Sequence, residues 1–343
     1  MPVAFATNDN HADHRTTRHV ERPERLTAVF ELLARAPVRR HLDRISFERP
    51  DLEVLYLAHR EDHVQHVARA IRAGYDGLDA DTYIAAGSLN VALDAVGALL
   101  GITRHVLDGL ANSGFAAIRP PGHHATPDRS MGFCLFSNVA IATRWAQSVA
   151  GIGRVLIVDF DVHHGNGTQD IFYDDPDVMY MSIHQTPFYP GTGDADERGT
   201  GDAVDCTINI PLQAGAGDDV YLHVFREILR PRALRFDPEL IFLSAGYDAH
   251  WKDPLGGMQV TTKGFAEMVR ELSDWANTCC DGRLIAALEG GYHLNALAHS
   301  VIATLDVLND GAARVEDPIG SAPGETTPLQ HFLRTLDGFS SID

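Results

Sequence analysis

Three potential metal ligands stand on alternate residues in the segment VDFDVHHGNGTQDIF, which covers residues 158–172: Asp159, Asp161 and His163. Side chains alternate across a strand, so these three share one face while the apolar residues between them point to the other. A row of two carboxylates and an imidazole is costly to bury unless a cation or hydrogen bonds compensate. Mixed carboxylate and imidazole ligation suits Zn²⁺, and a catalytic zinc has three protein ligands and one open position. The segment therefore predicts a zinc site that uses Asp161 and His163.

Other polar residues follow apolar, strand-like runs elsewhere in the chain. Asp248 ends the run ELIFLSAGYD, Tyr292 ends RLIAALEGGY, and the pair His123 and His124 follows GFAAIRP. In open α/β sheets, ligands bind beyond the carboxyl ends of the parallel strands. We therefore expect these strand ends to converge on one mouth, where Asp248 is the best candidate for the third zinc ligand.

Helix-like and strand-like segments alternate along the chain. Periodic apolar residues predict helices, and short apolar runs predict strands. The predicted helices cover residues 21–36, 62–74, 88–102, 138–150, 219–235 and 263–279, and the predicted strands cover residues 114–120, 154–162, 178–184, 205–212, 239–248 and 283–292. The alternation predicts an α/β fold in which helices cover both faces of a central, predominantly parallel sheet.

No Ser-, Gly- or Pro-rich linker divides this alternation. The sequence therefore predicts a single domain over residues 1–343, with a core over about residues 21–310. After the core, a short tail that contains Pro and Gly is expected to end in a helix near LQHFLRTL.

Charge and cysteine content limit the partners and the compartment. The chain has 28 Lys and Arg residues and 47 Asp and Glu residues, a net charge of −19, so its average surface field disfavours direct binding of nucleic acid. The four cysteines lack the paired spacing of a disulfide framework and fit a reducing compartment. No uninterrupted apolar stretch approaches the ~20 residues that span a membrane. We expect a soluble, cytoplasmic protein without a membrane partner; its oligomeric state stays open, a homo-oligomer included.

Six motifs in order along the chain carry a resemblance to a known family. They are RPPGHHA, GFCLFSN, DFDVHHGNGTQDIF, FYPGTGD, SAGYDAH with DPLGGM, and LEGGY. Together they resemble the zinc-dependent histone deacetylase family, with greatest similarity to its class II and bacterial amidohydrolase branch, from about Glu21 to His299. The resemblance implies an arginase/deacetylase-like three-layer αβα fold and the hydrolysis of acetyl or other short acyl groups from lysine side chains or related acylated amines.

The resemblance also implies roles for the residues at the strand ends. Zinc would be bound by Asp161, His163 and Asp248. His123 and His124 would flank the attacking water as acid, base and electrostatic partner, and Tyr292 would donate a hydrogen bond to the oxyanion. Asp159 would accept a hydrogen bond from His123, and Asn166 from His124. Many class I relatives have an Asp in place of Asn166; a neutral amide does not stabilise a protonated ring, which favours His124 as the proton acceptor.

Further expectations from the resemblance concern the substrate tunnel and structural potassium ions. Phe133 and Phe188 would line the tunnel, Gly132 would leave room for the substrate chain, and Asp81 would hold the substrate backbone at the rim. The expected ligands of one potassium ion are the Asp159 carboxylate, the Ser182 hydroxyl and the carbonyls of Asp161, His163 and Ile183. The expected ligands of a second are the carbonyls of Phe172, Asp175, Val178 and Cys206.

Three other functions are alternatives. A binuclear manganese ureohydrolase would need more acidic ligands, but Gly165 and His250 stand where its motifs have them. An inactive acyl-lysine binding module would be expected to lose Tyr292, a zinc ligand or the histidine pair, all of which are present. An acetylpolyamine amidohydrolase is the strongest alternative; relatives with that specificity have a Glu where this chain has Leu255 in DPLGG.

Overall fold

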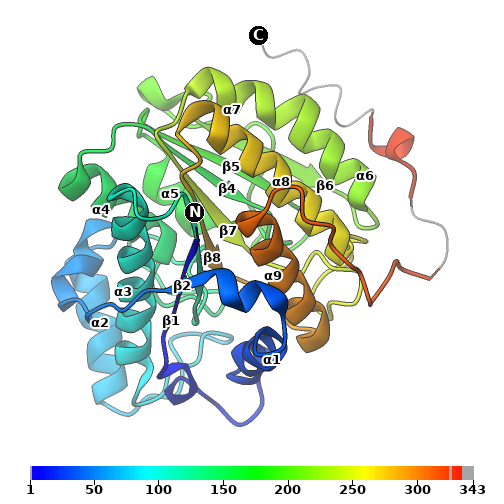
Figure 1. Cartoon of the computed structure of the whole chain (residues 1–343). Helices are drawn as coiled ribbons and strands as arrows, with labels where there is room; N and C mark the ends of the chain where they lie inside the picture. The colour runs from blue at the N-terminus through cyan, green and yellow to red at the C-terminus, as the bar shows by residue number, and fades with distance from the viewer. Residues whose placement is uncertain (1, 324–326, 334–343) are drawn as a thin grey trace.

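Eight strands form one sheet at the centre of the protein. The computed structural model describes residues 2–323 and 327–333, and within these ranges the strand order is β2-β1-β3-β8-β7-β4-β5-β6 (Figure 1). Every neighbouring pair is parallel. The strands are β1 (Val3–Thr7), β2 (Leu42–Arg44), β3 (Ser113–Ala117), β4 (Val155–Asp159), β5 (Val178–Gln185), β6 (Thr207–Leu212), β7 (Leu240–Ala245) and β8 (Leu284–Leu288).

Helices cover both faces of this sheet, as Figure 1 shows. Alternate strand residues supply two apolar cores: Val3 and Phe5 face one core with α1, α8 and α9, whereas Ala4 and Ala6 face the other with α2, α3 and α4. The helices are α1 (Glu24–Leu33), α2 (Glu61–Arg72), α3 (Ser88–Leu107), α4 (Asn138–Ala150), α5 (Asn166–Phe172), α6 (Asp218–His223), α7 (Arg230–Phe236), α8 (Thr262–Cys279) and α9 (Leu294–Asn309). The predicted α/β fold with a parallel sheet between two helical layers is therefore confirmed.

Four strands end earlier than the sequence predicts. β3 ends at Ala117, β4 at Asp159, β7 at Ala245 and β8 at Leu288, so the predicted strands over 114–120, 154–162, 239–248 and 283–292 are too long. The polar residues expected at the last strand positions lie instead on the loops that follow.

Three hydrogen bonds from backbone N–H groups to carboxylates fix the loop after β4. The N–H of Asp161 donates to Oδ1 of Asp159 at 3.1 Å, and the N–H of Val162 donates to Oδ1 of Asp248 at 2.9 Å. The N–H of His163 in turn donates to Oδ1 of Asp161 at 3.0 Å. Carboxylates thus replace a neighbouring strand as backbone acceptors, which ends the strand and fixes the loop at the same time.

The sequence prediction missed β1, β2, α5 and α9. β2 has three residues, and α9 packs against both α1 and α8. Apolar residues consequently occur on several sides of α9, and its amphipathic period is weak. In the predicted helix over 219–235, a π-helical segment (Val224–Leu229) lies between α6 and α7 and ends just before Pro231, which lacks the N–H that continues an α-helix.

The C-terminal tail is described only in part. Residues 329–333 are helical, in agreement with the predicted helix near LQHFLRTL, and residues 334–336 of that segment lie outside the described residues. Within the described ranges, no helix is both long enough and apolar enough to cross a membrane.

Candidate active site

The loops after four adjacent strands build one site. In sheet order these strands are β3, β8, β7 and β4, and because they are parallel their carboxyl ends meet at one edge. The loop residues concerned are His123 and His124 after β3, Tyr292 after β8, Asp248 after β7, and Asp161 and His163 after β4. The structure therefore brings the predicted strand-end residues to one place.

Asp161, His163 and Asp248 form a group whose ligand atoms all lie within 4.8 Å of one another. Nδ1 of His163 lies 3.0 Å from Oδ1 of Asp161 and 3.2 Å from Oδ2 of Asp248. Both carboxylates are fully buried. Burial and the Asp161 carboxylate raise the pKa of Asp248 to about 7, a sign of excess negative charge that a bound cation would relieve.

Two glycines leave space around these carboxylates. A Cβ on Gly290 would lie 2.2 Å from Oδ2 of Asp248 and 2.5 Å from Oδ2 of Asp161. A Cβ on Gly246 would lie 1.9 Å from Oδ2 of Asp161. The two carboxylates thus occupy a cradle that any larger residue would fill. Two carboxylate oxygens and one imidazole nitrogen suit Zn²⁺, so the residues fit that ion.

The histidine pair lies beside this group, and its two rings have different environments. Nδ1 of His123 donates to Oδ2 of Asp159 at 3.0 Å, and the hydroxyl of Tyr180 donates to the same oxygen at 3.1 Å. Burial disfavours a charged His123 ring, but the carboxylates of Asp161 and Asp159 outweigh burial and raise the pKa of His123 to about 10. Pairing with Asp159 therefore favours the charged form of the His123 ring.

His124 is the neutral member. Its Nδ1 lies 2.9 Å from Oδ1 of Asn166, an acceptor that makes Nδ1 the protonated nitrogen and leaves Nε2 free to accept a proton. Burial, followed by the charges of His123 and His163, holds the pKa of His124 well below its usual range. The contrast between the two rings gives one site a charged imidazole and a basic imidazole side by side.

Tyr292 follows β8, which lies between β3 and β7, and its ring is held in place by packing. Its ring lies under the guanidinium of Arg25, with Cζ 4.9 Å from the ring centroid, and meets the ring of Phe133 edge-on at 5.8 Å. Burial raises the pKa of Tyr292 well above its usual range. The phenol therefore stays protonated and can act as a hydrogen-bond donor.

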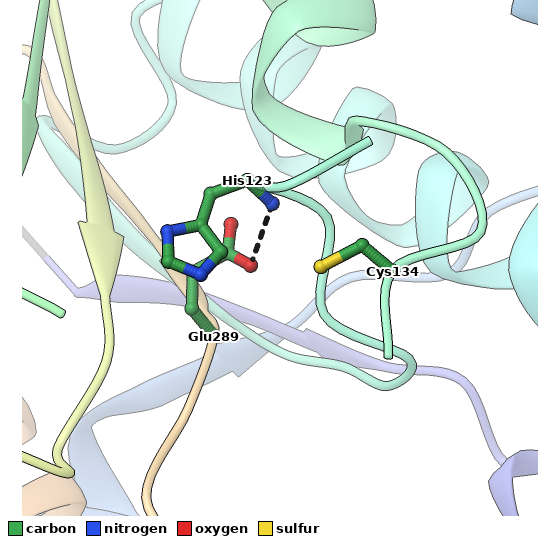
Figure 2. Close-up of side chains that lie close together, drawn as sticks. All are labelled: His123, Cys134 and Glu289. Carbon is green, nitrogen blue, oxygen red and sulfur yellow. Dashed lines mark hydrogen bonds between the residues drawn. The ribbon is translucent and has the colours of Figure 1, made fainter. Parts of the chain in front are cut away.

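A second group of close side chains consists of His123, Cys134 and Glu289 (Figure 2). Here the polar atoms already have partners. Oε2 of Glu289 accepts from the N–H of His123 at 3.2 Å and from the N–H of Gly122 at 2.6 Å, and the Cys134 thiol donates to the carbonyl of Gly132. Burial also raises the pKa of Cys134 well above its usual range. We therefore interpret this group as the support of the histidine pair.

Two of the residues expected to line the tunnel, Phe133 and Phe188, contact other residues of the site. The ring of Phe188 stacks on His163 at 5.2 Å, and Tyr189 meets His124 edge-on at 5.1 Å. The N–H of Phe133 donates to the Thr82 hydroxyl at 3.3 Å.

The remaining rim residues lie nearby. The Thr82 hydroxyl donates to Asp81, which places Asp81 beside the wall that carries Phe133. Leu255 is half-buried on the loop after β7. Gly132, with φ +55°, has no room for a side chain, because a Cβ would lie 2.4 Å from Cδ2 of His124.

Four contributing residues were not identified from the sequence: Arg25, Tyr189, Asp253 and Glu289. Tyr189 follows Phe188 in FYPGTGD, so its position beside an expected tunnel residue could have identified it from the sequence. No sequence signal could have identified Arg25, because an Arg in an amphipathic helix normally faces solvent. Here Arg25 is fully buried and donates to the carbonyls of Gly291 and Glu289.

A second metal beside the Asp161 group lacks ligands among the residues that the structure describes. His250 turns elsewhere: its Nδ1 accepts from the N–H of Lys252 at 3.1 Å, and its Nε2 lies 3.4 Å from the Thr262 hydroxyl. At Gly165, a Cβ would lie 2.3 Å from Oδ2 of Asp159, so an acidic side chain has no space there. This geometry disfavours the binuclear manganese alternative.

Known proteins resemble this chain over most of its length. Residues 19–308 match the model of the histone deacetylase domain. The rice (Oryza sativa subsp. japonica) protein named Histone deacetylase 10, chloroplastic is 39% identical over 329 residues, which cover 89% of this chain and 73% of the rice protein. The human (Homo sapiens) protein named Polyamine deacetylase HDAC10 is 38% identical over 329 residues, which cover 92% of this chain and 48% of the human protein.

A solved structure confirms the deacetylase-like fold. The crystal structure of the HDA15 HD domain superimposes with a TM-score of 0.85 at 37% identity and covers 90% of this chain and 91% of that chain. The family model and the similarity to named deacetylases over most of this chain lead to one conclusion. The chain belongs to the histone deacetylase family.

Proposed function

We propose that this protein is a zinc-dependent deacylase that removes acetyl or other short acyl groups from lysine side chains, or from related acylated amines. The observation that carries the proposal is one arrangement at the strand edge. The buried ligand group of Asp161, His163 and Asp248 lies beside His123, which is paired with Asp159, and His124, which is paired with Asn166. Amide hydrolysis needs these components together: an electrophilic centre, a base and an acid.

Asp161, His163 and Asp248 would hold the zinc ion. Zn²⁺ supplies Lewis-acid polarisation of the substrate carbonyl and lowers the pKa of water. Neutral His124 would take the proton of the attacking water through Nε2, while His123, paired with Asp159, supplies positive charge beside the reacting atoms. The Tyr292 hydroxyl would donate to the carbonyl oxygen as that oxygen becomes negative.

The aromatic residues around the entrance would hold the methylene chain of the substrate. Phe133 and Phe188 would form the walls, and the structure adds Tyr189 to them. Asp81 at the rim would accept hydrogen bonds from the substrate backbone. Gly132 has no Cβ, and this leaves space for the His124 ring beside the walls.

Gly132→Ala should lower turnover by about 10²-fold, since a displacement of about 1 Å at a catalytic group has an effect of that size. The matched control is Gly151→Ala, because Gly151 has a similar positive φ of +73° but no atom within 4 Å of its Cβ position. Both variants should show the strain of a left-handed alanine, about 1–2 kcal/mol in the free energy of unfolding. Only Gly132→Ala should lose kcat; equal kcat values for the two variants would remove the contact with His124 from the mechanism.

Structural potassium ions are part of the proposal. The first site would use the Asp159 carboxylate, the Ser182 hydroxyl and the carbonyls of Asp161, His163 and Ile183. Asp159 and Ser182 are cross-strand partners in the β4–β5 ladder, which supports this site. The second site would use the carbonyls of Phe172, Asp175, Val178 and Cys206. The carbonyls of Phe172 and Asp175 accept from Asp175 and Val178 in consecutive turns, and each carbonyl keeps a second lone pair.

The main alternative is an acetylpolyamine amidohydrolase, since the human relative is named a polyamine deacetylase. An acetylated polyamine carries a distal ammonium that gains from a carboxylate near the entrance. Leu255 stands at the position where polyamine-specific relatives have a Glu, and its side chain has no carboxylate. We therefore propose acyl-lysine side chains on peptides as the preferred substrates. The compartment stays a prediction, because the rice relative is named chloroplastic.

Leu255→Glu should shift the ratio of kcat/KM toward N8-acetylspermidine by about tenfold or more relative to an acetyl-lysine peptide. A charge-assisted contact in a partly desolvated site contributes about 1.5–3 kcal/mol, and each 1.36 kcal/mol is a factor of ten. Leu255→Gln is the matched control, because it has the shape of Glu without the charge, and should leave the ratio near the wild-type value. The wild type should prefer the peptide. A wild-type preference for the polyamine would contradict the proposed substrate class.

A panel of acyl-lysine peptides and acetylated polyamines, assayed side by side with zinc-loaded protein, tests the proposed function. We expect release of the short acyl group from the peptides. Acyl-lysine peptides that bind without being cleaved would instead indicate a binding module.

A further inference from the structure

Asp253 is a buried carboxylate that joins two loops of the site. Its side chain is 6% exposed. Its Oδ2 accepts from the N–H of Tyr292 at 2.6 Å and from the N–H of His293 at 3.0 Å. Its Oδ1 accepts from the N–H of Leu255 at 3.0 Å. One carboxylate therefore ties the loop after β7, which carries Leu255, to the loop after β8, which carries Tyr292.

The segment 289–293 is held on its other sides by different residues. Arg25 donates to the carbonyls of Gly291 at 2.7 Å and Glu289 at 2.5 Å, and the N–H of Gly290 donates to Oδ2 of Asp161 at 2.9 Å. None of these bonds reaches the backbone of Tyr292 itself. Asp253 is the residue that holds the Tyr292 N–H.

The backbone before Tyr292 needs such an anchor. Gly290 and Gly291 precede Tyr292, and Gly291 has φ +110°, a conformation open to glycine and rarely to other residues. Two successive glycines have wide conformational freedom, so their neighbours must fix the direction of the next side chain. A buried carboxylate is stable only when hydrogen bonds compensate for the loss of water. The three N–H groups that donate to Asp253 meet that need, and one of them is the N–H of Tyr292 itself.

We propose that Asp253 is a positioning residue that holds Tyr292 for oxyanion donation and couples it to Leu255 at the tunnel entrance. The inference rests on the proposed deacylase function and deepens it. Because Tyr292 acts only as charge develops on the substrate, its misplacement lowers kcat and leaves KM nearly unchanged. Loss of a residue with only a structural role would lower stability without lowering kcat at an unchanged KM.

Three substitutions distinguish the effect of losing the hydrogen-bond acceptors of Asp253 from the effect of losing its charge. Asp253→Ala removes both acceptor oxygens, and with them all three hydrogen bonds, and should lower kcat by about 10- to 100-fold, with KM for the peptide changed by less than about twofold. Asp253→Asn keeps one oxygen for the Tyr292 and His293 N–H groups and should recover kcat to within about threefold of wild type. Asp253→Glu keeps the charge but moves both oxygens by one methylene group, and should lower kcat by about tenfold. Should the alanine variant fail to fold, the glutamate variant carries the test.

A double-mutant cycle tests whether Asp253 acts through Tyr292. In the Tyr292→Phe background the hydroxyl that Asp253 positions is gone, so Asp253→Ala should lower kcat by less than about threefold further. An equal loss in both backgrounds would show that Asp253 affects the rate by another route and would overturn the inference.

A spectroscopic measurement reads the position of Tyr292 without activity. The chain has nine tyrosines, and incorporation of 3-fluorotyrosine labels each of them for ¹⁹F NMR. The signal of Tyr292 is identified as the one that is missing from the spectrum of Tyr292→Phe. This signal should shift or broaden in Asp253→Ala and Asp253→Glu. The control is Asp218→Asn, because Asp218 likewise accepts from a backbone N–H, that of Thr261 at 2.8 Å, but lies away from the 289–293 segment. It should change thermal stability only.

The two levels of the proposal fail separately. If wild type cleaves no acylated amine while the ¹⁹F signal responds to Asp253 variants, the proposed function is wrong and the positioning role of Asp253 stands. If wild type is an active deacylase but the foldable Asp253 variants keep both wild-type kcat and the wild-type ¹⁹F signal, the inference is wrong and the function stands.

Discussion

Replacing Asp248 by alanine is expected to remove bound zinc and deacylase activity together. Asp248 is fully buried, its Oδ2 faces Nδ1 of His163 at 3.2 Å, and it is one of three residues whose donor atoms converge. A residue that only supports a metal ligand typically changes metal affinity by about 10–100-fold. Loss of a ligand itself should exceed that, so the purified variant should contain no stoichiometric zinc and show no measurable turnover.

The effect on the fold should be small and separable. Oδ1 of Asp248 accepts from the N–H of Val162 at 2.9 Å, and leaving that N–H without a partner costs about 1–3 kcal/mol. Removal of a buried negative charge offsets part of this cost. Asp248→Asn is the matched control, because its oxygen can still accept from Val162 while the charge is lost. It should unfold at a temperature nearer that of wild type and still lack zinc.

Elemental analysis, thermal unfolding and peptide assays on the three proteins give the answer. One zinc per wild-type chain is the expected content. Two equivalents of manganese in active wild-type protein would contradict the mononuclear site, and an alanine variant that retains one zinc would remove Asp248 from the ligand set.

Tyr292→Phe is expected to keep zinc and to slow turnover by about 10²–10³, equivalent to about 2.7–4 kcal/mol of transition-state stabilisation. The loss falls on kcat because the hydrogen bond strengthens only as the carbonyl oxygen becomes negative. The phenylalanine ring keeps the contacts with Arg25 and Phe133, so the pocket should keep its shape. KM for the peptide should therefore change little.

Tyr247→Phe provides a matched loss of a buried hydroxyl. The Tyr247 hydroxyl pairs with that of Thr304 at 2.8 Å in the apolar core, away from the entrance. Its removal should cost about 0.5–1.5 kcal/mol of stability and leave kcat at the wild-type value. Steady-state kinetics and zinc content for both variants test the prediction; wild-type turnover in Tyr292→Phe on the preferred substrate would exclude Tyr292 from the chemistry.

Much of the site could be predicted because its information is local in the chain. The apolar runs before Asp161, Asp248 and Tyr292 place each of these residues just after the end of a strand. In a parallel sheet these ends must share an edge. The sequence alone therefore determined the α/β class, the edge that holds the site and the residues that meet there.

The tertiary structure decided what local patterns do not contain. The early end of β4 follows from the bond between the N–H of Val162 and the carboxylate of Asp248, two residues far apart in the chain. The packing of the buried Arg25 over the Tyr292 ring and the hydrogen bonds from the Tyr292 loop to Asp253 exist only after separate segments have met. Periodicity records which side of an element faces the core, because that depends on near neighbours. The partner of a buried charge depends on which distant backbone groups the fold brings within hydrogen-bond distance.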